Sequence, residues 1–379
     1  MNRRGFLAQA LGTAWLGASF LERASLRAAQ ARAQSKKALP TLFDIEKLGD
    51  GVYGAVARGR TILNSNAIIF ENAKDLLVVD SQAAPSAVYA LLAQIRREVT
   101  PKPVRYVVLT HLHGDHTQGL PAYRHQAAQV SIVASTSTWS RLESTGAARL
   151  KSATDAAPKS LANFLEQASK AKNAEERAYW QDMAAQTREF IEEMKTVPVE
   201  IPDITLDDHL VIHDRAHELR IFFRGRGHTA GDLFVYCPEA KVIATGDMLH
   251  SFFPYIGDGY PSEWPKTLRL VGELPFEKVA GGHGGMHPTA ERLPQQCAYL
   301  EELCEVVARA KEQGTPVERL LDATPPSSLK TLEQGGYGDY LVSQVKKHDY
   351  RVHLNTPEEV RARYVRENLT AVYKNLGRA

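Results

Sequence analysis

The chain has 379 residues, of which 44% are hydrophobic, so it can bury a large core within one large domain or two smaller ones. Its 46 basic and 44 acidic residues leave a formal charge of +2, which gives no electrostatic footprint for nucleic acid and excludes nucleic acid as an expected partner. Three cysteines are too few for a disulfide framework, and we expect them to be packed thiols.

Residues 1–33 are typical of an export signal that is not part of the fold. A basic segment at residues 2–7 precedes a weakly apolar stretch at 6–21, and small residues at 29–31 or 31–33 offer cleavage sites. The segment resembles a twin-arginine signal, which implies the twin-arginine export machinery as a partner and a periplasmic location after cleavage. It is too short and too polar for a comfortable membrane span, so no stable span is expected, and an uncleaved anchor is the alternative.

Short apolar runs separated by turns begin near residue 41. The first two runs are expected to pair as antiparallel strands. The order strand, helix, strand between residues 76 and 109 then predicts a parallel unit, and open α/β sheets place their sites at the carboxyl ends of such strands. The expected elements are strands at 52–56, 67–70, 76–79, 104–109 and 130–134, and a helix at 85–99.

Three histidines and one aspartate occupy six consecutive positions directly after a predicted strand. In an extended segment alternate side chains share a face, so His111, His113 and Asp115 are expected to point the same way. A bend at Gly114 would bring His116 to the same place. Mixed nitrogen and oxygen ligands suit zinc-like metals better than calcium. A surface loop that is merely rich in these residue types is the alternative, and further ligand candidates downstream disfavour it.

The stretch at about 140–195 is rich in Ala, Glu, Lys and Gln and predicts two antiparallel helices, the second beginning near Ala174. One interpretation is a lid or a dimerisation arm over the site, in which Phe164, Tyr179 and Trp180 contact substrate and the chain forms a homodimer. A packed helical insert fits the composition equally well.

Three further ligand candidates, His228, Asp247 and His283, each lie where an apolar strand gives way to glycine. Glycine lets the backbone approach a ligand closely. Taken singly each signal is weak, because such residues at strand ends are more often hydrogen-bonded structural residues; their agreement with the first cluster makes them candidates. The elements expected in this half are strands at 210–212, 219–223, 233–237, 242–245 and 279–280, and a helix around 264–274.

The last quarter of the chain carries no motif chemistry. It predicts a helix at 293–311, a loop at 325–328 and a capping box at residues 356–359 that opens a last helix. These helices are expected to pack against the rest of the fold or to form an oligomer contact.

In this order the motifs resemble the ligand motifs of the metallo-β-lactamase superfamily. The resemblance covers about residues 50–290 and implies an α/β fold, the αββα sandwich of two mixed sheets face to face with helices outside. We therefore expect the superfamily domain at 41–290 with a helical insert at about 140–195, followed by a C-terminal helical extension at 291–379. The residues that carry the resemblance are His111-Leu-His113-Gly-Asp115-His116, Gly227-His228-Thr229, Thr245-Gly246-Asp247 and Gly282-His283-Gly284, with Asp80 preceding them after its own strand.

The resemblance implies a centre of two metal ions. Two zinc ions are the expected cofactors, with iron or manganese as alternatives. They would share a hydroxide as the nucleophile, and Asp115 would also orient it or pass on its proton as a catalytic residue. The implied ligands are His111, His113 and His228 for one metal, Asp115, His116 and His283 for the other, and Asp247 as the bridge.

Two residues near these ligands receive other roles. Asp80 is expected to hold the loop or a ligand imidazole from outside. His250 is expected to face the small-molecule substrate as a catalytic residue, and a solvent-facing histidine is the alternative.

Two residues differ from those of particular branches of the superfamily, and these differences narrow the range of expected functions. His113 stands where the diiron flavoprotein branch has Glu, which disfavours oxygen-reducing chemistry. Asp247 stands near the place of a Cys in the best-known β-lactamase branch, and its setting resembles glyoxalase II, lactonases and exported members of the sulfur-oxidation or quinoprotein-associated type. The expected function is a periplasmic binuclear zinc-dependent hydrolase of a small ester, thioester, lactone or amide. The alternatives are a β-lactamase, a mononuclear iron sulfur dioxygenase, and an accessory or binding protein of a periplasmic redox system.

Overall fold

The computed structural model describes residues 41–59, 65–126, 129–288, 292–349, 352 and 354–378. The export signal predicted at residues 1–33 lies outside the described residues. Within the described part of the chain, no helix combines the length and the apolar character that crossing a membrane requires.

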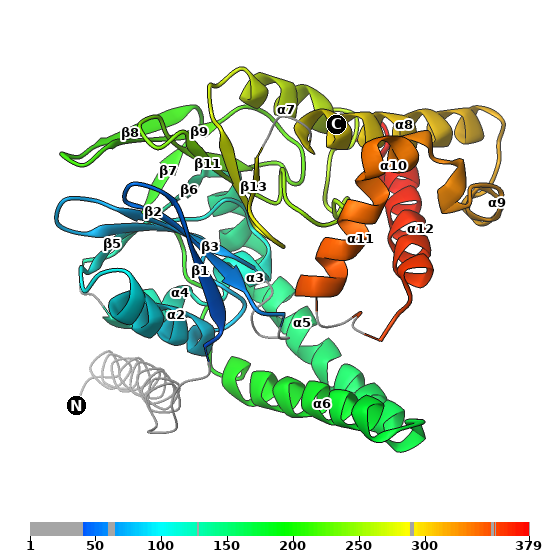
Figure 1. Cartoon of the computed structure of the whole chain (residues 1–379), viewed down its shortest axis with the longest axis horizontal. Helices are drawn as coiled ribbons and strands as arrows, with labels where there is room; N and C mark the ends of the chain where they lie inside the picture. The colour runs from blue at the N-terminus through cyan, green and yellow to red at the C-terminus, as the bar shows by residue number, and fades with distance from the viewer. Residues whose placement is uncertain are drawn as a thin grey trace, which may run out of the picture.

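Two β-sheets lie face to face, and helices cover their outer sides (Figure 1). The predicted αββα sandwich is therefore confirmed. The first sheet consists, in spatial order, of β1 (Phe43–Gly49), β2 (Val52–Ala57), β3 (Ala67–Glu71), β4 (Leu76–Val79), β5 (Val104–Val108), β6 (Ser131–Ser135) and β7 (Ile204–Leu206). The second consists of β13 (His287–Pro288), β12 (Lys278–Gly281), β11 (Val242–Gly246), β10 (Leu233–Cys237), β9 (Glu218–Phe223) and β8 (His209–His213).

Both sheets mix antiparallel and parallel pairs. The predicted antiparallel pairing of β2 with β3 is confirmed, as is the parallel unit in which α2 (Pro85–Glu98) connects β4 to β5. In the second sheet β11 and β12 are parallel, so their carboxyl ends lie side by side. The sequence missed the strands β1, β7 and β13, which are edge strands or short, and whose apolar patterns are weak.

Alternation along the strands divides the apolar side chains between two cores. In β3, Ile68 and Phe70 join the core between the sheets, whereas Ala67 and Ile69 face the core beneath the helices. Successive side chains of a strand point to opposite faces, so a strand buried on both sides is apolar throughout. This explains why the central strands read as continuous apolar runs.

Helices complete the outer layers. The first sheet packs against α2 and α4 (Leu120–Gln126), and the second against α7 (Trp264–Gly272) and α8 (Arg292–Glu312). The last part of the chain joins the core of the second sheet. Its helices are α9 (Val317–Ala323), η1 (Pro326–Ser328), α10 (Lys330–Glu333), η2 (Gln334–Gly336), α11 (Tyr337–His348) and α12 (Pro357–Asn375). The predicted capping box of α12 is confirmed, and the predicted loop at 325–328 contains the short helix η1.

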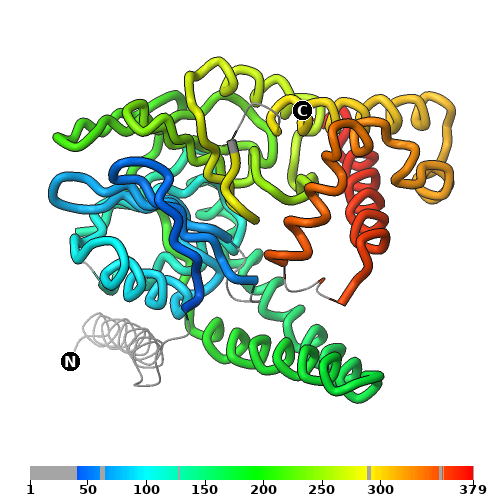
Figure 2. Tube along the Cα trace, in the orientation of Figure 1, coloured from blue at the N-terminus to red at the C-terminus, as the bar shows by residue number. Residues whose placement is uncertain are grey.

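The two helices predicted between about 140 and 195 form a hairpin that projects from the sandwich (Figures 1 and 2). They are α5 (Thr136–Lys170), which begins a few residues earlier than expected, and α6 (Ala174–Met194). That Phe164, Tyr179 and Trp180 contact substrate stays a prediction, and none of the three lines the cavity over the candidate metal centre. Phe164 stacks on Trp180 with ring centroids 5.8 Å apart, and Tyr179 packs edge-on against the same indole, so these rings hold the hairpin together.

The three cysteines are free thiols, as predicted. Cys237 and Cys297 are buried and Cys304 is partly buried. Burial raises the pKa of Cys297 and of Cys304 to about 11, so both are protonated at neutral pH and unsuited to act as nucleophiles or metal ligands.

Gly119 lets the loop that follows β5 approach the loop that follows β4. A Cβ atom on Gly119 would overlap the carbonyl oxygen of Ser81. The N–H of Gly119 donates to the carbonyl of Gln82 at 3.0 Å, and the N–H of Ser81 donates to the carbonyl of His116 at 2.9 Å. The absence of a side chain at Gly119 therefore positions His116 relative to Asp80.

We expect Gly119→Ala to lower the free energy of unfolding by about 1–3 kcal/mol, because the backbone of one loop must move away from the other. Urea unfolding followed by circular dichroism measures the change. Gly272→Ala is the matched control: the nearest atom to its added Cβ is a Leu293 methyl at 3.2 Å, and Ala is favoured over Gly in a helix. Equal stability of Gly119→Ala and wild type would contradict the steric argument.

Candidate metal centre

The predicted ligands come from strand ends of both sheets and meet at one edge of the sandwich. His111 and His113 follow β5, Asp247 directly follows β11, and His283 follows β12. His228 lies in the loop between β9 and β10. The structure assembles them into two groups that could each hold a metal ion: His111, His113, His228 and Asp247 in one, and Asp115, His116 and His283 in the other.

The expectation that Asp115 shares a face with His111 and His113 is wrong. A short helix, α3 (Gly114–Thr117), begins immediately after His113. In a helix successive side chains are rotated by about 100° rather than 180°, so the strand alternation ends at Gly114. Asp115 therefore lies with His116 and His283.

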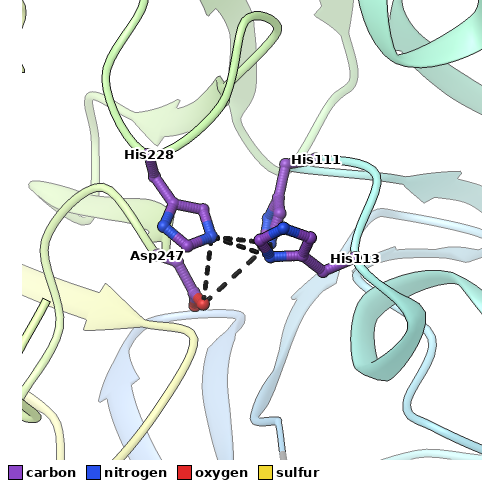
Figure 3. A group of neighbouring side chains, drawn as sticks. All are labelled: His111, His113, His228 and Asp247. Carbon is purple, nitrogen blue, oxygen red and sulfur yellow. Dashed lines mark hydrogen bonds and ion pairs between the residues drawn. The ribbon is translucent and has the colours of Figure 1, made fainter. Parts of the chain in front are cut away.

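The inward nitrogen atoms of three histidines form a nearly equilateral triangle (Figure 3). His111 Nε2 lies 3.1 Å from His113 Nδ1, and His228 Nε2 lies 3.1 and 3.0 Å from these two atoms. An ion roughly 2.0–2.1 Å from each nitrogen fits such a spacing. The carboxylate of Asp247 closes the group, with Oδ2 3.5 Å from His228 Nε2.

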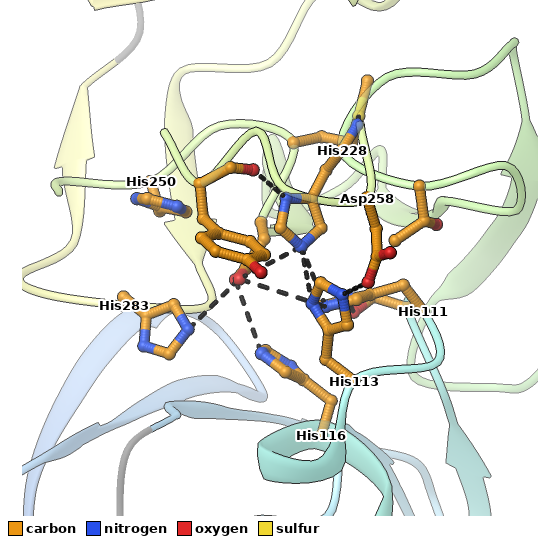
Figure 4. Close-up of polar contacts among 12 residues, drawn as sticks. His111, His113, His116, His228, His250, Asp258 and His283 are labelled. Carbon is orange, nitrogen blue, oxygen red and sulfur yellow. Dashed lines mark hydrogen bonds and ion pairs between the residues drawn. The ribbon is translucent and has the colours of Figure 1, made fainter. Parts of the chain in front are cut away.

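The outward nitrogen of each imidazole donates a hydrogen bond. His228 Nδ1 donates to the carbonyl of Tyr255 at 3.0 Å, and His113 Nε2 donates to the carboxylate of Asp258 at 2.9 Å (Figure 4). The Thr110 hydroxyl uses its proton on the carboxylate of Asp80, so it accepts from His111 Nδ1.

In their neutral form these histidines therefore turn three lone pairs, and no proton, toward one point. Burial first, and the neighbouring imidazoles second, hold the pKa of His111 well below its usual range. Burial likewise lowers the pKa of His228 to about 3, against the opposing field of Asp247. Converging lone pairs in a buried site repel one another unless a cation lies between them. The donor set thus fits a metal ion that prefers imidazole.

The second group has the opposite electrostatic character. His283 Nε2 lies 3.3 Å from Asp115 Oδ2 and 3.2 Å from Asp247 Oδ2, and His116 Nε2 lies 3.5 Å from Asp247 Oδ1. Burial opposes the charged form of both imidazoles, but the carboxylates outweigh it. They raise the pKa of His283 to about 10 and that of His116 well above its usual range.

Two buried atoms, His116 Nε2 of this group and Asp247 Oδ1 of the first, make no hydrogen bond among the described residues. They lie 3.5 Å apart, as an ion pair without hydrogen-bond geometry. Buried polar atoms are nearly always hydrogen-bonded, so neither atom has its usual partner in this arrangement. Both belong to residues whose ligand atoms lie close enough together to hold a metal ion.

Asp80 has the supporting role predicted for it. Its Oδ2 accepts from His116 Nδ1 at 2.8 Å, and its Oδ1 accepts from the N–H of Thr110 at 2.8 Å. The carboxylate thereby fixes one histidine of each group, His116 directly and His111 through the Thr110 hydroxyl. Asp80 adopts a φ of +68°, a backbone conformation that non-glycine residues rarely adopt and that functional sites often contain.

A cavity of about 540 Å³ opens over both groups. Aromatic side chains form one part of its wall, and two ion pairs, Arg149 with Asp258 and Arg363 with Glu367, form another. The aromatic residues are Phe252, Phe253, Tyr255 and Tyr364.

His250 lines this cavity and is only 4% exposed, so the alternative of a solvent-facing histidine is wrong. Its Nδ1 accepts the N–H of Phe252 at 3.0 Å, which leaves the proton on Nε2. Burial lowers the pKa of His250 to about 4, so the ring is neutral near pH 7. A neutral imidazole with Nε2–H is a hydrogen-bond donor without a full charge.

A family model described as the metallo-beta-lactamase superfamily matches residues 60–283. The chain belongs to the metallo-β-lactamase superfamily. Solved structures of similar fold include a metallo-beta-lactamase from Pontibacter korlensis, with 17% identity, a TM-score of 0.50, and coverage of 68% of this chain and 99% of that chain. The DIM-1 metallo-beta-lactamase is 18% identical with a TM-score of 0.48, covering 68% and 97% of the two chains, and TMB-1 is 17% identical with a TM-score of 0.49, covering 69% and 97%.

Sequence reasoning missed the residues that come from outside the superfamily motifs. Arg149 reaches the cavity from α5, Asp258 from an irregular loop, and Arg363, Tyr364 and Glu367 from α12. The expected packing of the last quarter of the chain against the sandwich is confirmed, and α12 in addition lines the cavity. The glycines flanking Asp258 are a weak signal of a loop near a site, whereas nothing in the sequence of α12 distinguishes its cavity residues.

We expect Asp258→Ala to weaken metal binding about 10–100-fold, because the imidazole of His113 would lose the acceptor that fixes its orientation and tautomer. Hydrogen bonding to His113, followed by that to Arg149, holds the pKa of Asp258 well below its usual range, so the carboxylate is charged in the folded protein. Competition with a chromogenic chelator measures the affinity. Asp155→Ala, which removes an exposed carboxylate of α5, is the control and should leave the affinity unchanged.

The pKa of His283 also predicts the pH dependence of metal-free protein. A histidine with a raised folded-state pKa contributes stability that is fully present below its unfolded pKa of 6.5 and is lost as the pH rises through about 10. The free energy of unfolding of chelator-treated protein should therefore fall between pH 6.5 and 10. Urea unfolding at several pH values should show a weaker dependence in His283→Gln; an identical dependence would contradict the assignment.

Proposed function

We propose that the protein is a binuclear zinc-dependent hydrolase that acts in the periplasm on a small ester, thioester, lactone or amide. The observation that carries the proposal is the pair of ligand groups that share the carboxylate of Asp247 beneath one cavity. Five imidazoles and two carboxylates form this set, and imidazole-rich sites suit zinc, although iron and manganese accept the same ligands.

Bound divalent ions would activate water as a nucleophile near neutral pH and polarise the oxygen of the bond to be cleaved. His111, His113 and His228 would hold one ion, Asp115, His116 and His283 the other, and Asp247 would contact both. The chain preorganises these ligands through Asp80, Asp258 and the Tyr255 carbonyl, so little rearrangement is needed when metal binds.

Two further side chains are suited to proton and hydrogen-bond chemistry. Asp115 is partly exposed to the cavity, and its pKa lies far below the usual range because the opposing charges of His116 and His283 outweigh burial. A carboxylate with so low a pKa stays charged, which suits it to orient a water molecule. The neutral Nε2–H of His250 can donate to an oxygen of the substrate. The aromatic wall would bind an apolar part of the substrate.

The pattern of residues 1–33 supports a periplasmic location. Cell fractionation of the native host tests it: the processed chain is expected in the periplasmic fraction, and an unprocessed chain in the cytoplasm would contradict export.

Zinc-loaded protein should hydrolyse at least one compound in a panel of esters, thioesters, lactones, amides and a chromogenic cephalosporin, and chelation should abolish the turnover. We expect His111→Ala and Asp247→Ala to abolish it as well, because each removes a ligand from the buried centre. His209→Ala and Asp208→Ala are matched controls, since both side chains are exposed. His209 begins β8, and Asp208 directly precedes it.

The remaining outcomes separate the alternatives. Turnover of the cephalosporin and of no other compound would favour a β-lactamase. A metal content of one iron per chain would favour a sulfur dioxygenase. Full metal binding without turnover of any compound would contradict the hydrolase and favour an accessory protein of a redox system.

A further inference from the structure

The loop of residues 255–258 supports two of the three histidines in the first ligand group. The carbonyl of Tyr255 accepts from His228 Nδ1 at 3.0 Å, and the carboxylate of Asp258 accepts from His113 Nε2 at 2.9 Å (Figure 4). The loop belongs to no helix or strand. Its position, and with it the orientation of both imidazoles, therefore depends on what holds the loop from outside.

The C-terminal helix α12 supplies that support. Asn375 Nδ2 donates to two successive carbonyls of the loop, Ile256 at 2.8 Å and Gly257 at 3.0 Å. The side chain of Asn375 is 4% exposed, so water does not compete for these bonds. Arg378 adds a third contact, because its Nη1 donates to the carbonyl of Asp258 at 3.1 Å. Three consecutive loop carbonyls are thus bound by the end of α12 and the residues that follow it.

The helical insert holds the same loop from another side. Arg149 of α5 donates to Asp258 Oδ2 at 2.8 Å, the oxygen that also accepts from His113. Neither α5 nor α12 contributes a ligand to either group. The contacting residues of both helices are more than 100 positions away from the loop in the sequence. Figure 1 shows the two helices on different sides of the sandwich.

We propose that Asn375 and Arg378 are positioning residues of the metal centre, which act through the loop 255–258 to set the affinity of the three-histidine group. The inference rests on the metal binding proposed above. His116 in the other group is oriented by Asp80 instead, so loss of the α12 contacts affects the two groups unequally. The C-terminal extension is thereby a functional part of the centre rather than only a packing element.

Helix α12 offers a matched control for Asn375. Asn368 lies seven positions earlier, is 3% exposed, and donates through Nδ2 to the hydroxyl of Tyr299 at 3.2 Å. Asn368→Ala removes a buried amide and its hydrogen bond from the same helix without touching the loop. Arg378→Ala complements Asn375→Ala, because Arg378 is exposed and its removal leaves the core intact.

The test is titration of chelator-stripped, full-length protein with Co²⁺, followed by visible absorption and by competition with a chromogenic chelator. His111→Ala and His283→Ala assign the two binding events to the two groups. We expect Asn375→Ala to weaken Co²⁺ binding at the three-histidine group about tenfold and to alter the absorption of Co²⁺ bound there. Tenfold is the lower end of the effect of removing a residue that hydrogen-bonds a metal-ligating side chain directly. Arg378→Ala should change both readouts in the same direction and by less. Asn368→Ala should lower the unfolding midpoint and leave the Co²⁺ affinity and spectrum unchanged.

Unchanged Co²⁺ affinity and spectrum in Asn375→Ala and Arg378→Ala would overturn this inference while leaving the proposed function intact. Equal losses of affinity in Asn368→Ala would also overturn it, because they would trace the effect to general stability. Absence of Co²⁺ binding by the wild-type protein would overturn the proposed metal binding and this inference together.

Discussion

Three imidazole nitrogens, two of them on buried histidines, face one another at 3.0–3.1 Å, and the rest of the site is arranged to keep them there. Each ring is held in the required tautomer by an acceptor on its far side: a hydroxyl, a carboxylate and a backbone carbonyl. Without these acceptors the rings could share protons as ordinary hydrogen-bonded histidines. With them, the lone pairs converge on one point, where a cation would relieve their repulsion.

The sandwich brings these groups together because strand ends of two sheets meet at one edge. Asn66, just before β3 of the first sheet, donates to the carbonyls of Gly281 and Gly284 on either side of His283 in the second, and its N–H donates to the carbonyl of Gly282. The N–H of Leu233 in the second sheet donates to the carbonyl of Thr110, which follows β5 of the first sheet. These buried bonds fix the relative position of the two ligand-bearing edges.

The two ligand groups differ in how they would exchange protons for metal. Burial lowers the pKa of His111 and of His228 in the first group, whereas neighbouring carboxylates raise the pKa of His116 and of His283 in the second. Metal binding is therefore expected to displace protons from His116 and His283 but not from His111 and His228, so the two affinities should depend differently on pH. Asp247 couples the groups, because its two oxygens face both.

The ligands could be predicted from the sequence because each sits in a short segment where an apolar strand gives way to a glycine-rich turn. That local pattern made His228, Asp247 and His283 candidates, and the resemblance of the ordered motifs to the superfamily implied their roles and the sandwich. It did not give the direction of Asp115, because the helical turn at Gly114 is too short to leave a periodic pattern. Asp258, Arg149 and Asn375 were missed for a different reason: their contacts join segments more than 100 positions apart, and such contacts leave no mark on local composition.

The central claim is that the chain holds one metal ion in each ligand group. Diffraction data collected at the zinc absorption edge from crystals grown with zinc test it most directly. We expect two anomalous peaks per chain, one among His111, His113 and His228 and one among Asp115, His116 and His283, with Asp247 in contact with both. A single peak, or peaks elsewhere on the molecule with none at these residues, would contradict it.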